Sequence, residues 1–132
     1  MVNGNKDDSC RKTCDLTGDK NNITLIHEDQ ITYCANMFRE LTNVIEVDLS
    51  NFDTSKVTHM HAMFHMCSNI EKITLGKLNT SSVKDMQSLF SNCNKLISLD
   101  LSYFDTSKVT NMNYTFSGCS SLSSIDISNL IF

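Results

Sequence analysis

The apolar residues of this chain recur with a period of 26 residues. One position of the repeat is always phenylalanine, and other positions hold valine, methionine or cysteine in successive copies. The clearest recurrences are Phe38, Phe64, Phe90 and Phe116, then Val57, Val83 and Val109, then Met60, Met86 and Met112, then Cys67, Cys93 and Cys119. There are three full copies (50–75, 76–101 and 102–127), a degenerate copy before them (24–49) and a stub after them (128–132). A fixed period of this length predicts a stacked repeat protein.

Each copy contains a stretch whose apolar spacing is typical of an α-helix. In the first full copy, Val57, Met60, Phe64 and Cys67 would share one helical face. A D-T-S or N-T-S tract precedes each stretch and would cap its first turn, so we interpret Thr54, Thr80 and Thr106 as capping residues rather than as an ice-binding threonine row. The pattern predicts helices near 31–39, 57–66, 83–92 and 109–117.

A second stretch in each copy alternates apolar and polar residues, as in Ile70-x-x-Ile73-x-Leu75. This spacing is the strand signature of a leucine-rich repeat and predicts strands near 46–49, 72–75, 98–101 and 124–127. Neither element can bury its apolar face alone, whereas stacked copies can. The sequence therefore predicts an α/β fold: a right-handed leucine-rich-repeat-like solenoid, with parallel strands on a concave face and the wider helices on the convex face.

We assign residues 23–132 to this solenoid and residues 1–22 to a non-repeat N-terminal segment or cap. Ile23, Leu25 and Ile26 are candidates for a first edge strand. At the other end, the chain stops five residues into a new copy, which leaves the last strand without a neighbour. The C-terminal end is therefore a candidate for weak self-association, with two copies meeting end to end around a two-fold axis.

The repeat resembles a known family. Residues 47–70 read V-D-L-S-N-F-D-T-S-K-V-T-H-M-H-A-M-F-H-M-C-S-N-I, and residues 99–122 read L-D-L-S-Y-F-D-T-S-K-V-T-N-M-N-Y-T-F-S-G-C-S-S-L. Both are similar to the repeat of the BspA-like leucine-rich repeat surface proteins, and the resemblance covers roughly residues 31–132. It implies a fragment of a larger extracellular or cell-surface protein that binds or adheres to protein or glycan ligands. A structural spacer that projects another domain is the alternative.

Composition and charge exclude several other classes of protein. The 132 residues carry 11 basic and 15 acidic side chains, a net charge of −4, which argues against a nucleic-acid partner. No apolar run is long enough to insert into a membrane. No nucleophile, base or phosphate-binding glycine loop stands at a recognised spacing, so we expect no enzyme activity, no catalytic residue and no cofactor.

The outward positions of the predicted strands are the candidate ligand-binding residues, because a concave sheet is the usual binding face of a solenoid. They are Glu46, Asp48, Lys72, Thr74, Ser98, Asp100, Ser124 and Asp126. Three aspartates share one repeat position there, and carboxylates stacked at strand spacing repel one another unless a cation intervenes. We expect these aspartates to be ordinary repeat residues. The face carries no aromatic anchor of the kind that concentrates energy at tight protein interfaces.

The histidines and cysteines are the remaining candidates for a metal site or a cross-link. His61 and His65 have the i, i+4 spacing that places two imidazoles on one helical face, but the other copies hold varied polar residues there, so a solvated surface is expected instead. We expect Cys67, Cys93 and Cys119 to be buried free thiols and Cys34 to lie in the core. Cys10 and Cys14 are disulfide candidates, either with each other or one of them with Cys34.

Overall fold

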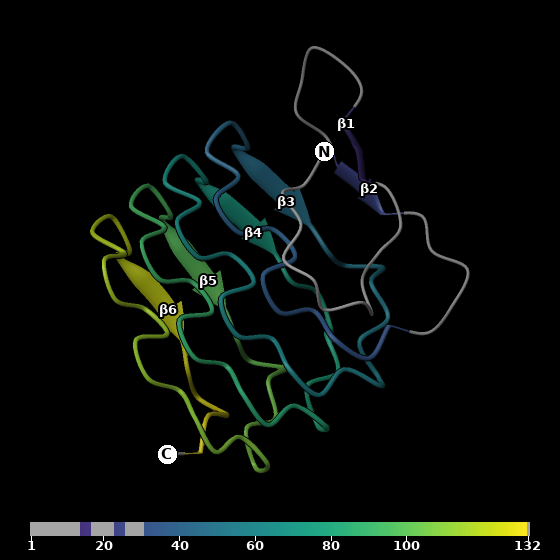
Figure 1. Ribbon diagram of the computed structural model, residues 1–132. Coiled ribbons are helices and arrows are strands. Elements are labelled where there is room, and N and C mark those ends of the chain that lie inside the picture. The colour runs from purple at the N-terminus through teal and green to yellow at the C-terminus, as the bar shows by residue number, and fades with distance from the viewer. Residues whose placement is uncertain (1–13, 17–22, 26–30, 132) are drawn as a thin grey trace.

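The structure, a computed structural model, describes residues 14–16, 23–25 and 31–131. One open sheet contains four parallel strands: β3 (Glu46–Asp48), β4 (Lys72–Thr74), β5 (Ser98–Asp100) and β6 (Ser124–Asp126). They lie side by side in chain order (Figure 1), one from each successive repeat. Val47 pairs with Ile73, and Leu99 pairs with Ile125, both 26 residues apart. One parallel strand per repeat is therefore confirmed, in the predicted register.

A separate two-stranded antiparallel sheet precedes the repeats. It joins β1 (Cys14–Leu16) to β2 (Ile23–Leu25). The sequence predicted a strand at residues 23–26 on the edge of the parallel sheet. A strand is present, but its partner is β1 rather than β3.

The predicted helices are wrong: the part of the chain that the structure describes contains none. In their place, each repeat has a chain of short turns, in which N–H groups donate to carbonyls three residues back. The N–H of Met63 donates to Met60, that of His65 to Ala62 and that of Cys67 to Phe64, at 3.1–3.2 Å. The backbone of these turns repeats every four residues, with positive φ at Ala62 and Met66, and so buries nearly the same positions as a helix of 3.6 residues per turn.

The backbone takes positive φ angles at two places in this turn segment of each repeat, four residues apart. The seven non-glycine residues concerned have φ between 53° and 61°: Asn36, Glu40, Ala62, Met66, Ser88, Asn92 and Tyr114. Gly118 occupies the last equivalent place, with φ of 76°. A positive φ costs a non-glycine residue about 1–2 kcal/mol, so other contacts must hold these turns in place.

Those contacts are hydrogen bonds between the turn segments of neighbouring repeats. Every second N–H donates to the carbonyl 25 residues later, giving four such bonds between each pair of repeats, as in Met60 to Asp85 at 2.9 Å and Phe64 to Leu89 at 2.9 Å. We call this set of bonds the turn ladder. Isolated parallel bridges connect Tyr33 to His59, His59 to Asp85 and Asp85 to Asn111 along the same side.

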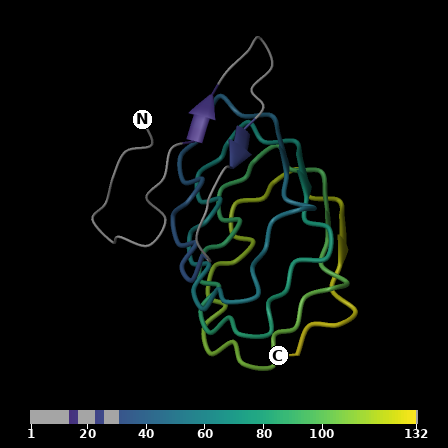
Figure 2. The same cartoon turned by 90° about the vertical axis from the view of Figure 1, so that its right-hand side faces the viewer.

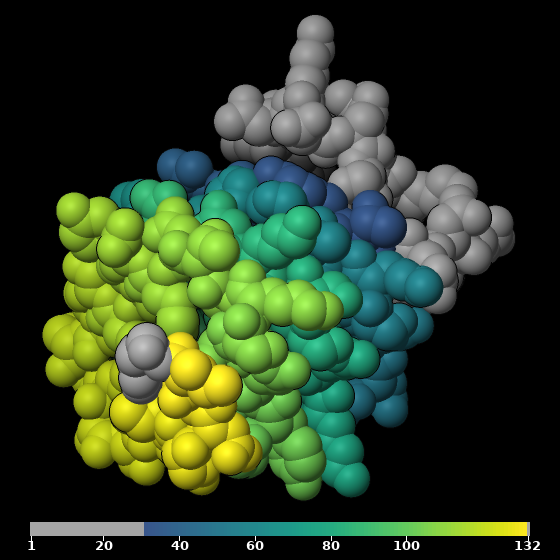
Figure 3. All heavy atoms as spheres, turned by 90° about the horizontal axis from the view of Figure 1, so that it is seen from below, coloured from purple at the N-terminus to yellow at the C-terminus, as the bar shows by residue number. Residues whose placement is uncertain are grey.

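The turn ladder changes the expected shape of the stack. A helix is about 10–12 Å wide, whereas hydrogen-bonded chains lie about 4.8 Å apart. Because both sides of each repeat bond directly to the next repeat, the two sides have similar spacing. Figure 2 shows the repeats as nested loops, and Figure 3 shows them as neighbouring bands of colour. The physical reason for expecting a concave sheet, namely wide helices behind it, is therefore absent.

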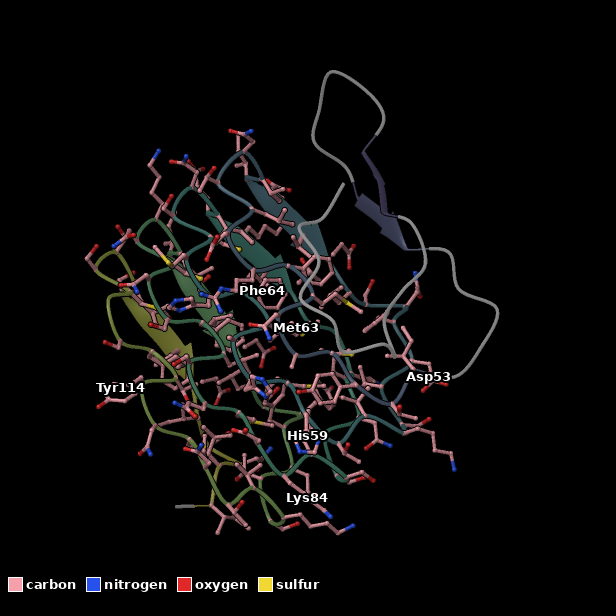
Figure 4. The ribbon with its side chains drawn as sticks, in the orientation of Figure 1. Asp53, His59, Met63, Phe64, Lys84 and Tyr114 are labelled. Atoms are coloured by element: carbon pink, nitrogen blue, oxygen red, sulfur yellow. The ribbon has the colours of Figure 1, made fainter. Side chains whose placement is uncertain are left out.

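Identical side chains stack on one another inside the loops. The rings of Phe38, Phe64, Phe90 and Phe116 lie nearly parallel, with neighbouring centroids 5.1–5.9 Å apart. Met60, Met86 and their apolar neighbours surround them and are at most 2% exposed. Figure 4 shows Phe64 and Met63 inside the stack and Tyr114 pointing outward. The equivalent core positions of the last repeat, including Met112 and Phe116, are only partly buried.

The three repeated threonines do not cap helices; they are buried and join neighbouring repeats. The hydroxyl of Thr80 donates to the carbonyl of Asp105 at 3.0 Å and accepts from the N–H of Asp105 at 2.8 Å. Thr106 makes the same pair of bonds to Ile131, and Thr54 donates to Asn79. The aspartate or asparagine before each threonine accepts the N–H of the following serine, as Asp53 does from Ser55 at 2.9 Å.

We expect Thr80→Val to destabilise the fold by about 1–3 kcal/mol, because an isosteric side chain leaves the N–H and carbonyl of Asp105, which face the buried Thr80, without their partner. Urea denaturation followed by circular dichroism measures this. Thr110→Val is the matched control: Thr110 is exposed and water can replace its bond to Lys84, so a change under about 0.5 kcal/mol is expected. Equal losses in the two variants would contradict the buried role of Thr80.

Glycine substitution distinguishes turns from helices, because it raises the free energy of unfolding at a residue with positive φ and lowers it inside a helix. Met66 is 44% exposed with φ of 61°, so Met66→Gly should raise stability by about 0.5–1 kcal/mol as the unfavourable φ is relieved. Lys84→Gly, at an exposed position of ordinary φ, should lower it by about 0.5–1 kcal/mol. If both glycines lower the thermal midpoint, as they would in a helix, the turn geometry at Met66 is incorrect.

Candidate binding surfaces

The outward face of the four-stranded sheet contains all eight candidate residues predicted from the sequence. Glu46, Asp48, Lys72, Thr74, Ser98, Asp100, Ser124 and Asp126 alternate with buried or half-buried residues along their strands. Thr74 is half-buried and the other seven are exposed. Pairing places Glu46 beside Lys72, and Asp100 beside Asp126. The sheet therefore brings these side chains together on one polar surface.

The aspartates of this face are already engaged in local turns. Oδ1 of Asp48 accepts the N–H of Ser50 at 2.8 Å, and Asp100 and Asp126 make the equivalent bond to Ser102 and Ser128. Hydrogen bonds from the backbone and side chain of these serines hold the pKa of each aspartate below its ordinary value. The neighbouring Asp100 works in the opposite direction on the pKa of Asp126. These carboxylates therefore stabilise the corner after each strand.

A shallow depression borders the same sheet where the strands begin. It encloses about 530 Å³ and is lined by Thr42, Asn43, Ile45, Asn69, Glu71 and Lys95. Its side chains are polar apart from Ile45, which is 49% exposed. None of its lining residues is aromatic, so it offers little that would anchor a ligand.

A second polar surface follows the turn ladder. Tyr33, His59, Asp85 and Asn111 occupy the same repeat position and are joined by parallel bridges. His61, Gln87 and Asn113 occupy the position two residues later. We call these seven residues the polar row; all of them are half-buried or exposed. The sequence predicts a solvated helix surface at the histidine positions, whereas the structure places them beside aromatic, carboxylate and amide groups from neighbouring repeats.

The N-terminal part of the polar row is a cluster of three rings. The ring centroid of Tyr33 lies 5.2 Å from that of His59 and 5.8 Å from that of His61, and the two histidine rings lie 6.4 Å apart. Nδ1 of His61 lies 3.5 Å from Oδ2 of Asp85. Nδ1 of His59 is within hydrogen-bond distance of the Thr58 hydroxyl, at 2.9 Å.

The C-terminal part of the polar row is a network of amides. Nδ2 of Asn111 donates to Oε1 of Gln87 at 3.0 Å. The N–H of Gln87 donates to Oδ1 of Asp85 at 2.9 Å, and the N–H of Asn113 donates to Oδ1 of Asn111 at 3.1 Å. These bonds fix the planes of Asp85 and Asn111 relative to the backbone.

The structure gives His61 and His65, which the sequence offers only as a weak metal candidate, different surroundings. No helix brings the two rings onto one face, and within the described residues no three histidine, cysteine, aspartate or glutamate side chains group closely enough to hold a metal ion. Burial lowers the pKa of His65, the Arg39 charge lowers it further, and Glu40 opposes the shift. His65 therefore belongs to a different environment from His61, which faces Asp85.

The repeated cysteines form a row of buried thiol donors. Sγ of Cys67 donates to the carbonyl of Phe38 at 2.9 Å, and Cys93 and Cys119 make the same bond to Phe64 and Phe90. Cys67 and Cys93 are free and buried as expected, whereas Cys119 is free but only half-buried. Burial raises the pKa of Cys67 to about 11 and also raises the pKa values of Cys93 and Cys119. Protonated thiols of this kind are poor nucleophiles and metal ligands.

Cys34 is also buried, as the sequence predicted. The predicted disulfide depends on Cys10 and on the side chain of Cys14, which lie outside the part of the chain that the structure describes. The proposed cap at residues 1–22 also lies there, apart from the backbone of β1. Among the described residues, no helix has the length and apolar character needed to cross a bilayer.

Comparison with known protein families identifies the repeat. Residues 12–130 match the family described as "Mycoplasma protein of unknown function, DUF285". The chain belongs to the DUF285 family. No curated protein and no solved structure matches it. The polar row and the sheet face are therefore surfaces of a DUF285 chain.

We expect the sheet-face aspartates to make DUF285 stability depend on acid pH. Their folded pKa values lie below the ordinary value of 3.8, so their stabilising contribution is fully present above that pH and is lost as the pH falls through the folded pKa. Thermal midpoints measured between pH 2 and pH 6 should fall steeply at the acid end. The triple variant Asp48→Asn, Asp100→Asn, Asp126→Asn should flatten this slope, because asparagine retains the acceptor oxygen but does not titrate. An unchanged slope would assign the acid sensitivity to other groups.

Proposed function

We propose that this chain is a non-enzymatic binding module of a BspA-like extracellular or cell-surface protein, with protein or glycan ligands. In this proposal the stack is a right-handed leucine-rich-repeat-like solenoid in which turn segments replace helices. One observation carries the proposal: residues that hold the fold recur in every repeat, whereas residues on the polar row change from repeat to repeat.

The recurring residues stabilise the interior of the stack. Phe64, Thr80 and Cys93 are buried, and each contacts the neighbouring repeat through a ring or a hydrogen bond. The polar row differs, because its one bridged position holds tyrosine, histidine, aspartate and asparagine in turn. The turn ladder uses only backbone atoms, so it does not dictate these side chains. A rigid frame with freely chosen surface groups supports a binding role.

A structural spacer is the second candidate. The observation that favours it is the continuous bonding on two sides of the stack, through the parallel sheet and the turn ladder. Such a stack resists bending and would hold another domain at a fixed distance. A spacer, however, gives no reason for aromatic and histidine groups to gather at one end of the polar row.

The remaining parts of the proposal follow from the chemistry of the described residues. The raised thiol pKa values support a module without cysteine catalysis. Weak self-association through the C-terminal end accompanies the proposal as a second partner surface, because core positions such as Phe116 and Leu122 are only partly buried there.

The test is a binding array of extracellular matrix proteins and glycans, incubated with the purified 132-residue protein. A binding module should give specific signals that excess soluble protein abolishes. Met86→Asp is the control: Met86 is 1% exposed, so an unpaired charge there should unfold the chain and remove the signals. Absence of every signal from the folded protein would favour the spacer.

A further inference from the structure

We propose that the polar row binds an uncharged oligosaccharide that lies along the stack of repeats. This inference rests on the binding function proposed above and gives it a site and a ligand class. The site is made of Tyr33, His59, His61, Asp85, Gln87 and Asn111.

The backbone carbonyls of this surface already accept hydrogen bonds within the stack. The carbonyls of His59 and His61 accept from Cys34 and Asn36, and those of Asp85 and Gln87 accept from the repeat before them, at 2.8–3.0 Å. A peptide strand that adds to a sheet edge needs free backbone groups, so this mode of recognition does not fit the row. Binding must come from side chains.

The side chains of the row are planar, polar and held in place. Asp85 and Asn111 are each fixed through Oδ1 by a backbone N–H two residues later, and Asn111 is also bonded to Gln87. Carboxylate and carboxamide groups offer paired acceptors and donors in one plane, which suits neighbouring hydroxyl groups on a sugar ring. Because these groups are already ordered, less conformational entropy is lost on binding.

The ring cluster adds an apolar surface beside the polar groups. Tyr33 and His59 are half-buried, and their rings are tilted by 31° to each other at 5.2 Å. An aromatic ring has an apolar face and a polar tip, which matches the C–H face and the hydroxyl edge of a sugar. The described members of the cluster are half-buried Tyr33, His59 and His61, which carry polar atoms, whereas a docked amphipathic helix needs an apolar groove.

The charge of the row favours an uncharged ligand. Asp85 is its only acidic residue, and no lysine or arginine belongs to it. Phosphate, sulfate and carboxylate groups are usually recognised by clustered arginines or by lysine, which the row lacks.

The spacing of the row favours a linear oligomer over a single sugar. Equivalent groups of neighbouring repeats are about one strand separation apart, roughly 4.8 Å. This distance is close to the length of one sugar unit in an extended chain. An oligosaccharide lying along the stack would meet Tyr33, His59 and Asp85 in successive repeats.

The experiment uses the full 132-residue protein and a panel of uncharged tri- and tetrasaccharides of glucose, galactose, mannose and N-acetylglucosamine, together with sulfated and carboxylated oligosaccharides of the same length. Calorimetric titration identifies the binding sugar. Nuclear magnetic resonance of the labelled protein should then show shifts of the His59 ring and of the Gln87 and Asn111 side-chain amides. His59→Ala and Gln87→Ala should each weaken binding at least tenfold. Lys72→Ala and Ser98→Ala, on the sheet face, should leave it unchanged, and circular dichroism should show all four variants folded.

Three outcomes would overturn the inference. No panel sugar binds; or a sugar binds, but only the sheet-face variants weaken it; or only charged oligosaccharides bind. In each case the proposed binding function is judged separately, by whether the array of matrix proteins and glycans gives a competed signal. A matrix-protein signal that survives His59→Ala and Gln87→Ala would retain the binding function and reject the polar row as its site.

Discussion

The turn ladder constrains everything else in this molecule. It requires every second N–H of residues 34–40, and of the equivalent segments, to point toward the next repeat, while the intervening N–H groups bond back within their own turn. A backbone can do both only if it takes positive φ at fixed places, such as Ala62 and Met66. The conformational cost of these residues is offset because the ladder satisfies donors and acceptors that would otherwise be buried without partners.

The strands could be predicted from the sequence because they need only a short alternation of apolar and polar residues. Val47, Ile73 and Leu99 alternate with exposed residues, and a period of 26 sets their register. Prediction failed on the turn segments because the same apolar positions serve a helix and a series of four-residue turns. Residues 109–119, V-T-N-M-N-Y-T-F-S-G-C, contained the missed signal, since asparagine, threonine, serine and glycine are poor helix formers.

The candidate sites differ in the same way as the strands and the turn segments: one could be predicted from a local pattern and the other could not. The sheet face could be predicted from strand alternation alone, and all eight of its residues lie there. The 26-residue period aligns Tyr33, His59 and Asp85, but the close spacing of the polar row depends on a turn ladder that the apolar pattern does not reveal. The predicted role of the threonines failed for a related reason, because it depended on helices that the described residues do not form. The hydroxyl of Thr80 and Oδ1 of Asp48 bond to backbone groups at corners, so both side chains fix the path of the chain.

The turn ladder also has a direction, which bears on association through the C-terminal end. Within the turn ladder, each repeat donates N–H groups toward the C-terminal side and accepts them on the other side, as Met60 donates to Asp85 and His59 accepts from Cys34. Within the described residues, the N–H groups of Met112, Tyr114, Phe116 and Gly118 make no such bond. A two-fold arrangement of two such ends would place donors opposite donors along the ladder, leaving both rows unsatisfied. An edge that presents carbonyls at every second residue is the complementary partner, and the N-terminal side of a repeat of this type has that geometry. The ladder therefore has complementary donor and acceptor sides, and repeats stack through it in one direction only.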